Sequence, residues 1–127
     1  MTQSSFLIGQ LFKISDGLHK LYCEEVRDGK LPSQLLGNAL MTAALESPVQ
    51  ALAQLASRIK PYLGWAQTNH KEQTAGLSRY YLKLYEDIAN QLKGQNLPAR
   101  LNDAERAQFL LGYLASKPKK NSEPVQS

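Results

Sequence analysis

Few side chains in this sequence have the chemistry needed for catalysis or for holding a metal ion. His19 and Cys23 are four residues apart and could share a helix face, and His70 is the second of only two histidines. A structural zinc site needs four ligands, so these residues do not make one. The acidic pairs Glu24–Glu25 and Glu86–Asp87 are adjacent in sequence, and adjacent side chains diverge around a helix. Without a phosphate-binding loop or nucleophile motif either, we expect no metal, no cofactor and no enzymatic activity.

The basic residues are concentrated in the middle of the chain. Residues 47–83 contain five basic side chains and one acidic side chain, so this block carries +5 − 1 = +4, which equals the net charge of the whole chain. The five are Arg58, Lys60, Lys71, Arg79 and Lys83. A localised positive charge on a small domain is typical of a protein that binds a phosphate-rich partner. The alternative interpretation is a basic helix face that is simply solvated.

We predict that these five basic residues contact nucleic-acid phosphates, with His70 and Gln54 as supporting contacts. No group of side chains is typical of base-edge readout, so binding would depend on salt and not on base sequence. Two alternatives stay open. Lys83 could instead pair with Asp87 and Glu86 one helical turn further on, and Trp65 could either stack on a base or serve only in packing.

The rest of the sequence predicts helices and no strands. Five helices are expected, at about residues 5–28, 32–46, 47–63, 74–93 and 102–116, with Ser47 as an N-cap and a polar loop at 64–74. Gly29 and Gly94 are typical helix stops, and Asn102 with Glu105 forms a capping-box pattern. Pro32 and Pro48 suit first helical turns, whereas Lys60–Pro61 should disturb the last turn of the third helix. Gly9 and Gly17 would allow a neighbouring helix to approach closely.

These elements predict an all-α fold. We expect a single helical bundle of about five helices over residues 1–116 and a disordered tail over residues 117–127, which lacks apolar anchors. No apolar run is long enough to span a bilayer, and the N-terminus does not resemble a secretory signal. The single cysteine, Cys23, fits a reducing compartment. A cytoplasmic location is therefore expected, without a membrane or a small-molecule substrate as partner.

Four segments carry a likeness to a known family. They are FLIGQLF (6–12), ESPVQALAQL (46–55), RYYLKLYEDI (79–88) and LPARLNDAERAQFLLGYL (97–114), and they occur in this order. Together they resemble the C-terminal helical region of the large subunit of type I-C CRISPR Cascade, which is also made as a separate small subunit from an internal start. The chain begins with Met1 and contains little besides this region, so it resembles the free small subunit.

The resemblance implies a non-catalytic role in antiviral defence. Such a subunit assembles with crRNA, the large subunit, the backbone subunits and further copies of itself, and it helps to hold the target DNA and the displaced strand of the R-loop. The guide RNA reads the sequence, while the protein contributes a positive channel. Stacked copies need contacts between two different faces, for which Tyr80, Tyr85 and Tyr113 are candidates if they are exposed, although each could equally belong to the core. The alternative function is a helical protein–protein interaction module that does not contact nucleic acid directly.

Overall fold

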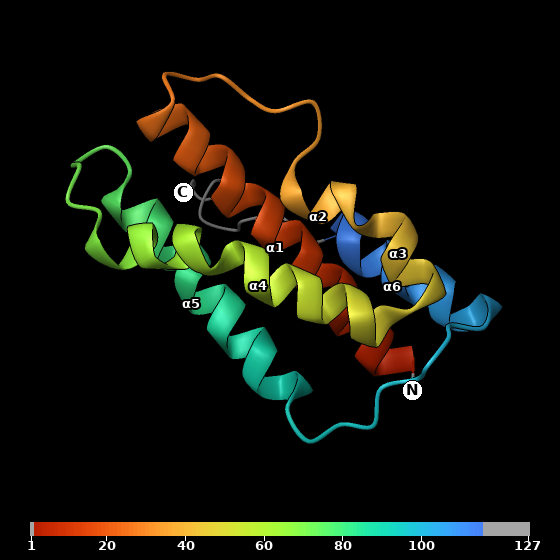
Figure 1. Ribbon diagram of the computed structural model, residues 1–127. Coiled ribbons are helices and arrows are strands. Elements are labelled where there is room, and N and C mark those ends of the chain that lie inside the picture. Colours follow the sequence, from red (N-terminus) through yellow and green to blue (C-terminus); the bar gives the residue numbers. More distant parts are fainter. Residues whose placement is uncertain (1, 116–127) are drawn as a thin grey trace.

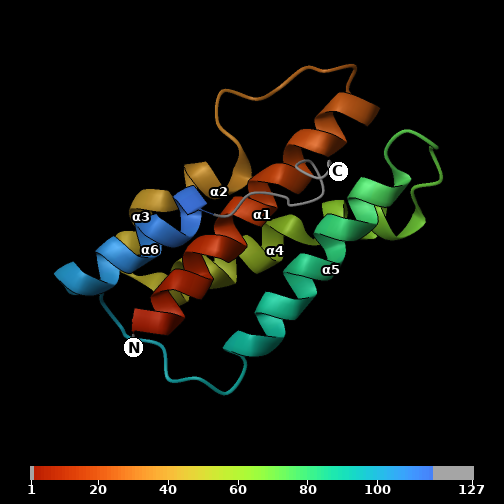
Figure 2. The same ribbon diagram turned by 180° about the vertical axis from the view of Figure 1, so that it is seen from behind.

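The computed structural model describes residues 2–115, which form an all-α bundle. The helices are α1 (Thr2–Val26), α2 (Leu36–Ala39), α3 (Met41–Glu46), α4 (Pro48–Thr68), α5 (Ala75–Leu92) and α6 (Asp103–Ala115). The fold class predicted from the sequence is therefore confirmed, whereas the predicted disordered tail, residues 117–127, lies outside the described residues. Helix α1 runs through the middle of the bundle (Figure 1), with α5 on one side and α2, α3 and α6 on the other (Figure 2).

The hydrophobic core surrounds α1, which packs against α2, α4, α5 and α6. Two phenylalanines, Phe12 of α1 and Phe109 of α6, are fully buried, and their rings meet edge to face with centroids 5.5 Å apart. The other buried apolar side chains of α1 are Leu7, Ile8, Leu11, Ile14, Leu18, Leu21 and Cys23. A helix that is covered on several sides needs more than one apolar stripe, which explains this composition.

Glycines let the backbones of α1 and α6 pack directly against each other. A Cβ atom on Gly9 would fall against the carbonyl oxygen of Phe109, and a Cβ on Gly112 would fall against the carbonyl oxygen of Phe6. A Cβ on Gly17 would meet the ring of Tyr81 in α5. The close approach predicted at Gly9 and Gly17 is confirmed.

The single helix predicted over residues 32–46 is wrong. The chain forms two short helices there, α2 and α3, with Leu40 between them at φ −100° and ψ 4°. Pro32 lies in the loop before α2 and does not begin a helix. The preference of proline for a first helical turn is local, and it does not decide where this segment starts.

Side chains of α1 set the start of α2. The backbone N–H of Leu36 donates to Nδ1 of His19 at 3.0 Å. The N–H groups of Gly37 and Asn38 donate to Oδ1 of Asp16 at 2.5 and 3.2 Å. The first N–H groups of a helix have no partner within it, so these acceptors supply a cap that the local sequence does not.

The third predicted helix is longer than expected. Helix α4 continues through Pro61 to Thr68, so the predictions of a disturbed turn at Lys60–Pro61 and of a loop beginning at residue 64 are wrong. Proline removes one N–H donor, and the carbonyl left without it belongs to Ser57. Ser57 and Pro61 are both exposed, so water can satisfy that carbonyl. Trp65 therefore lies on a helix and not in a loop.

Most helix ends follow local signals. Gly29 and Gly94 adopt φ of +81° and +79°, as expected of helix stops. The N–H of Asn102 donates to Glu105 Oε1 at 2.9 Å, and the N–H of Glu105 donates to Asn102 Oδ1 at 2.8 Å, which confirms the capping box. Ser47 is the N-cap of α4, but within the described residues its side chain makes no capping hydrogen bond.

Candidate nucleic-acid interface

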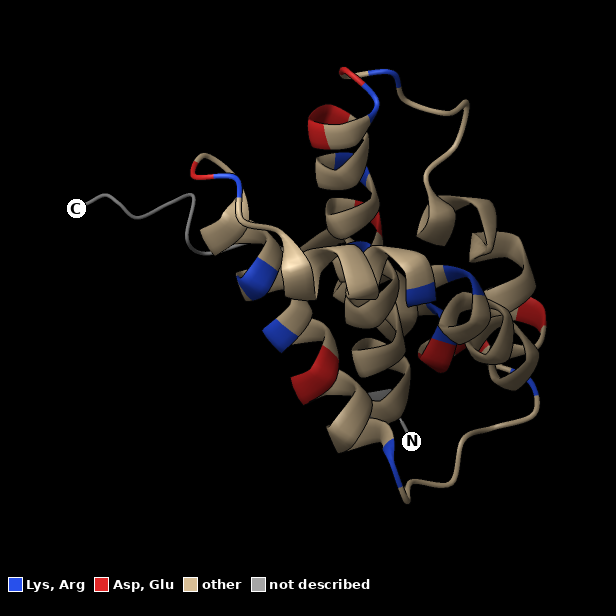
Figure 3. Cartoon of the chain, turned by 60° about the vertical axis from the view of Figure 1, so that its left-hand side comes forward, with Lys and Arg blue, Asp and Glu red and all other residues tan. Residues whose placement is uncertain are grey.

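All seven predicted contact residues are exposed. Gln54, Arg58 and Lys60 lie on α4, His70 and Lys71 lie in the α4–α5 loop, and Arg79 and Lys83 lie on α5. Helices α4 and α5 pack against each other, so the block stays within one region of the bundle. Basic and acidic segments nevertheless alternate around the molecule (Figure 3), so this block does not become an uninterrupted basic face.

The two basic residues of α4 project to different sides. Arg58 and Lys60 are two positions apart, which corresponds to about 200° around a helix axis. Arg58 shares its side with Gln54 and Trp65, whereas Lys60 shares the outermost side with Ala53 and other small exposed residues. Within residues 2–115, neither Arg58 nor Lys60 has an ion-pair partner. Both therefore present an uncompensated charge to the solvent.

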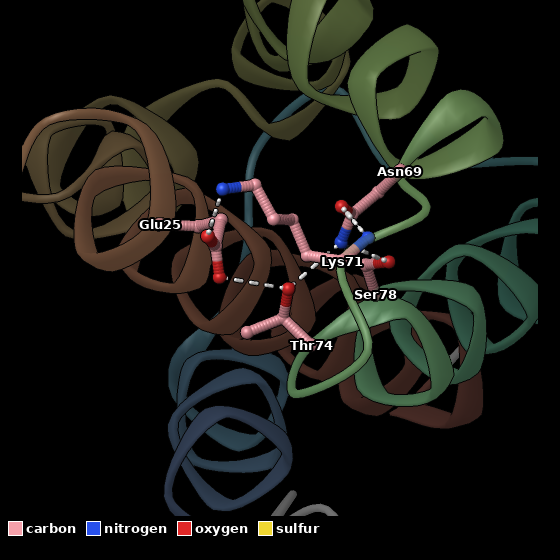
Figure 4. Close-up of polar contacts among 5 residues, drawn as sticks. All are labelled: Glu25, Asn69, Lys71, Thr74 and Ser78. Atoms are coloured by element: carbon pink, nitrogen blue, oxygen red, sulfur yellow. Dashed lines mark hydrogen bonds and ion pairs between the residues drawn. The ribbon is translucent and has the colours of Figure 1, made fainter.

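Lys71 belongs to a polar network that joins the α4–α5 loop to the end of α1 (Figure 4). Its Nζ lies 3.5 Å from Glu25 Oε2, and Glu25 Oε1 accepts a hydrogen bond from the Thr74 hydroxyl at 3.0 Å. The buried Asn69 donates from Nδ2 to Thr74 Oγ1 at 2.9 Å and to Ser78 Oγ at 3.2 Å. Its Oδ1 accepts from the backbone N–H of Lys71 at 3.0 Å. These bonds connect the loop to α1 and α5.

The two basic residues of α5 make contacts within the chain. The Arg79 guanidinium donates to the carbonyl of Asn69 at 3.0 Å and to that of Gln67 at 3.5 Å. These carbonyls lie at the C-terminal end of α4, where a cation also complements the helix dipole. Lys83 Nζ lies 3.6 Å from Asp87 Oδ2, the pairing that the sequence left open. An exposed pair contributes about 1 kcal/mol or less, so Lys83 can exchange Asp87 for a phosphate.

A depression with a volume of about 370 Å³ opens where the end of α1 meets the α4–α5 loop. Its lining combines the apolar surfaces of Val26 and Trp65 with the polar side chains of Glu25, Thr68, Asn69, His70 and Lys71. Two of the predicted contact residues, His70 and Lys71, therefore come together here. The other five do not line this depression.

Four aromatic rings form a row between α1 and α4 that leads to the depression. His19 stacks on Tyr62 with centroids 4.6 Å apart, Tyr62 contacts Tyr22 at 4.9 Å, and Tyr22 contacts Trp65 at 5.4 Å. The rings of Tyr62, Tyr22 and Trp65 are only half-buried, so the row reaches the surface. Burial raises the pKa of the Tyr62 hydroxyl.

Sequence reasoning missed a second polar cluster, centred on Asp16, which is 4% exposed. Besides the N–H groups of α2, Asp16 accepts a hydrogen bond from the Tyr113 hydroxyl of α6. Burial raises the pKa of Asp16, while the bonds from Tyr113, Asn38 and Gly37 oppose the shift. Burial and the bond to Asp16 raise the pKa of Tyr113 to about 12, and Lys13 Nζ lies 4.8 Å from its ring centroid. A charged residue among apolar helix positions was the signal that could have revealed this cluster.

The tyrosines considered as docking residues do not form one class. Tyr85 is buried in the core, so the second of the two possibilities left open for it is confirmed and its role as an exposed docking residue is wrong. Tyr113 is half-buried and bonded to Asp16, and Tyr80 is half-buried on α5, with its ring 6.2 Å from that of Tyr81.

Sequence reasoning also missed four residues of the depression, its polar network and the aromatic row: Glu25, Asn69, Tyr22 and Tyr62. They act through contacts between distant segments, which spacing along the chain does not reveal.

Comparisons with known proteins find no match among family models, curated proteins or solved structures. Within residues 2–115, no three side chains of His, Cys, Asp or Glu gather to hold a metal ion. In the same part of the chain, no helix has the length and apolar character needed to cross a membrane. A functional proposal therefore rests on the residues described above and on the resemblance of the four segments.

The capping role of His19 predicts a loss of stability in mild acid. Its Nδ1 accepts the Leu36 N–H, and burial lowers its pKa below the ordinary value of about 6.5, against the opposing charge of Asp16. The unfolded chain then binds the proton more tightly. The contribution of His19 to the free energy of unfolding should be complete above about pH 6.5 and should fall as the pH drops towards the folded-state pKa, by at most about 1.4 kcal/mol per pH unit. Urea unfolding at about pH 7.5 and about pH 5.5 measures this change.

The two histidines provide a matched pair of variants for this test. His19→Gln keeps a hydrogen-bond acceptor but does not titrate, so its stability should change less between the two pH values than that of the wild type. His70→Gln alters an exposed loop residue and should keep the wild-type pH dependence. A His19→Gln profile parallel to that of the wild type would contradict the assignment.

Proposed function

We propose that this chain is the non-catalytic small subunit of a crRNA-guided type I-C CRISPR Cascade complex, in which it stabilises target DNA and the R-loop in antiviral defence. The observation that carries the proposal is the surface of α4. Arg58 and Lys60 project from it without an ion-pair partner among residues 2–115, and α4 contains no acidic residue. When such cations contact phosphates, they release the counterions condensed on the nucleic acid, which favours binding without reading the base sequence.

Two further observations support this proposal. The four segments that resemble the family fall on α1, on the α3–α4 junction, on α5 and on the region of α6, so the resemblance extends through the bundle. A rigid helical module with exposed cations is also what a complex needs when guide RNA reads the target and protein holds the backbone. The partners would be crRNA, target DNA, the large and backbone subunits and further copies of the chain, in the cytoplasm.

The seven predicted residues would contribute unequally. Arg58 and Lys60 are available without breaking a contact. Lys71 and Lys83 must leave Glu25 and Asp87, which costs less at Lys83, because both members of that pair are exposed while the Glu25 side chain is only 16% exposed. The remaining three residues would contribute less. Part of the Arg79 guanidinium is bound to carbonyls, so Arg79 would act through its charge. His70 and Gln54 would each donate a single hydrogen bond.

Charge reversal at Arg58 and Lys60 is expected to weaken target-DNA binding by the assembled complex. Each lost phosphate contact should reduce the slope of log affinity against log salt by about 0.7 on a single strand, so the Arg58→Glu/Lys60→Glu variant should lose about 1.4. Affinity at low salt should fall by about tenfold or more. A binding series over salt concentration, with complexes that contain wild-type or variant subunit, measures both quantities.

Lys93→Glu is the matched control, because Lys93 is an exposed lysine at the far end of α5. It should leave the salt slope unchanged. Arg79→Glu needs a parallel stability measurement, since Arg79 also binds the last carbonyls of α4. If R-loop formation proceeds equally well with the double variant and the wild type, the assignment of this interface is wrong.

A protein–protein interaction module without nucleic-acid contact is the second candidate function. Leu111 and Leu114 of α6 favour it, because they are 51% and 66% exposed and lie close together on one short helix. Co-purification with a crRNA-containing complex, followed by a gel shift with single-stranded DNA over a salt series, separates the two. A complex that lacks salt-sensitive DNA binding would favour the module, and failure to associate would remove the Cascade proposal.

A further inference from the structure

Three half-buried rings of the aromatic row, those of Tyr22, Tyr62 and Trp65, have no part in the phosphate contacts proposed above. We infer that this row and the adjoining depression bind one unpaired nucleotide, with its base against the aromatic rings and its phosphate on Lys71. This inference rests on the proposed contact with nucleic acid. It goes further because it makes the base a ligand and places the site between α1 and α4.

The exposure of these rings distinguishes them from the aromatic residues of the core. Phe12 and Phe109 are fully buried, whereas Tyr22, Tyr62 and Trp65 are half-buried. Trp65 also lines the depression beside Val26, which is 48% exposed. Accessible aromatic rings next to a basic surface are the usual platform for unpaired bases, and one stacked base strengthens binding by about tenfold.

The basic groups lie where a phosphate attached to such a base would be. Lys71 and His70 line the same depression as Trp65. The Lys71 side chain is 67% exposed, and its contact with Glu25 is an ion pair at 3.5 Å, so it can turn to a phosphate.

Two polar side chains of the depression are already bonded within the chain. The Asn69 amide is bonded to Thr74, to Ser78 and to the N–H of Lys71. The Thr68 hydroxyl donates to carbonyls of its own helix. Neither of these two side chains is therefore available to read a base edge, so the proposed binding relies on stacking and charge.

The dimensions of the depression favour one unpaired nucleotide over a duplex. Its volume of about 370 Å³ is at the small end of the range for pockets that hold small molecules. In a duplex, both faces of each base are covered by its neighbours, so a base must leave its stack to meet Trp65. A single strand, such as the displaced strand of an R-loop, offers its bases at lower cost.

The chain contains one tryptophan and six tyrosines, so emission excited at a wavelength that only tryptophan absorbs reports on the surroundings of Trp65. The full chain is titrated with oligothymidylate of about ten nucleotides and with a strand of equal length whose residues are abasic. Anisotropy of an end-labelled strand, followed in parallel, gives the affinity. The oligothymidylate should quench Trp65 emission, and the abasic strand should bind at least about fivefold more weakly without quenching it.

Three variants are expected to lower, raise and leave unchanged the affinity for oligothymidylate. Lys71→Gln should weaken binding of oligothymidylate by about threefold. Glu25→Gln should tighten it by a similar factor, because it removes the competing charge and keeps an acceptor for Thr74. Lys93→Gln, at the far end of α5, should leave the affinity unchanged.

The outcomes separate this inference from the proposed function. The strand could bind in a salt-sensitive way without changing Trp65 emission, or the abasic strand could bind with equal affinity. Either result overturns the inference but remains consistent with the proposed phosphate contacts. Quenching by a polyglutamate peptide as strong as that by DNA assigns the depression to an acidic protein and also overturns it. If the free chain binds no strand at low salt, the inference fails, while the proposed function is judged on the assembled complex.

Discussion

Gly9→Ala is expected to lower the free energy of unfolding by about 3 kcal/mol. The added Cβ would meet the carbonyl oxygen of Phe109 and the backbone nitrogen of Tyr113 in α6. Both atoms belong to helical backbone and cannot rotate away as a flexible side chain could. The two helices would have to separate, which would disturb the contact between the Phe12 and Phe109 rings. Urea unfolding followed by circular dichroism measures the loss.

Gly64→Ala is the control for this prediction. Gly64 also lies inside a long helix, α4, but among the described residues no heavy atom beyond its chain neighbours and the nearby backbone of α4 is within 4 Å of the position that its Cβ would occupy. The variant should be more stable than the wild type, by up to about 1 kcal/mol, because alanine has the higher helix propensity. A Gly9→Ala protein at least as stable as the wild type would contradict the close approach of α1 and α6.

The parts of the fold that depend on local signals were predictable from the sequence. Periodic apolar residues indicated α1 and α5, and the capping box of Asn102 and Glu105 marked the start of α6. The start of α2 was not predictable in this way, because its N–H groups are capped by Asp16, 22 positions away from Asn38. The continuation of α4 past Pro61 also depends on context, since the site is exposed to water.

The candidate site was also predictable only where local sequence determines it. Exposure of Arg58, Lys60 and Lys83 followed from their charge and helix positions. The contacts that determine which cations are available did not, because they join distant segments. Thr74 and Glu25, for example, are 49 positions apart, and their contact brings Lys71 to the depression. Trp65 was a candidate for stacking from the sequence, but its aromatic neighbours on α1 required the folded arrangement.

Asp16→Ala is expected to lower the free energy of unfolding by about 3 kcal/mol, because it removes the carboxylate that joins three helices. The N–H groups of Gly37 and Asn38 in α2 and the hydroxyl of Tyr113 in α6 would lose their acceptor. These groups are buried or partly buried, so water replaces the lost bonds incompletely. Urea unfolding gives the overall loss, and amide hydrogen exchange at Gly37 and Asn38 should accelerate as the cap disappears.

Asp16→Asn should cost much less than Asp16→Ala. Since burial raises the pKa of Asp16, the group favours the folded state at acid pH and loses that contribution as the pH rises through the raised pKa. An asparagine keeps an acceptor for the α2 N–H groups without a buried charge. Tyr113→Phe should cost about 1 kcal/mol, and the Asp16→Ala/Tyr113→Phe double variant should lose less than the sum of the single changes. Additive losses, together with unchanged exchange at Gly37, would show that Asp16 does not couple α2 to α6.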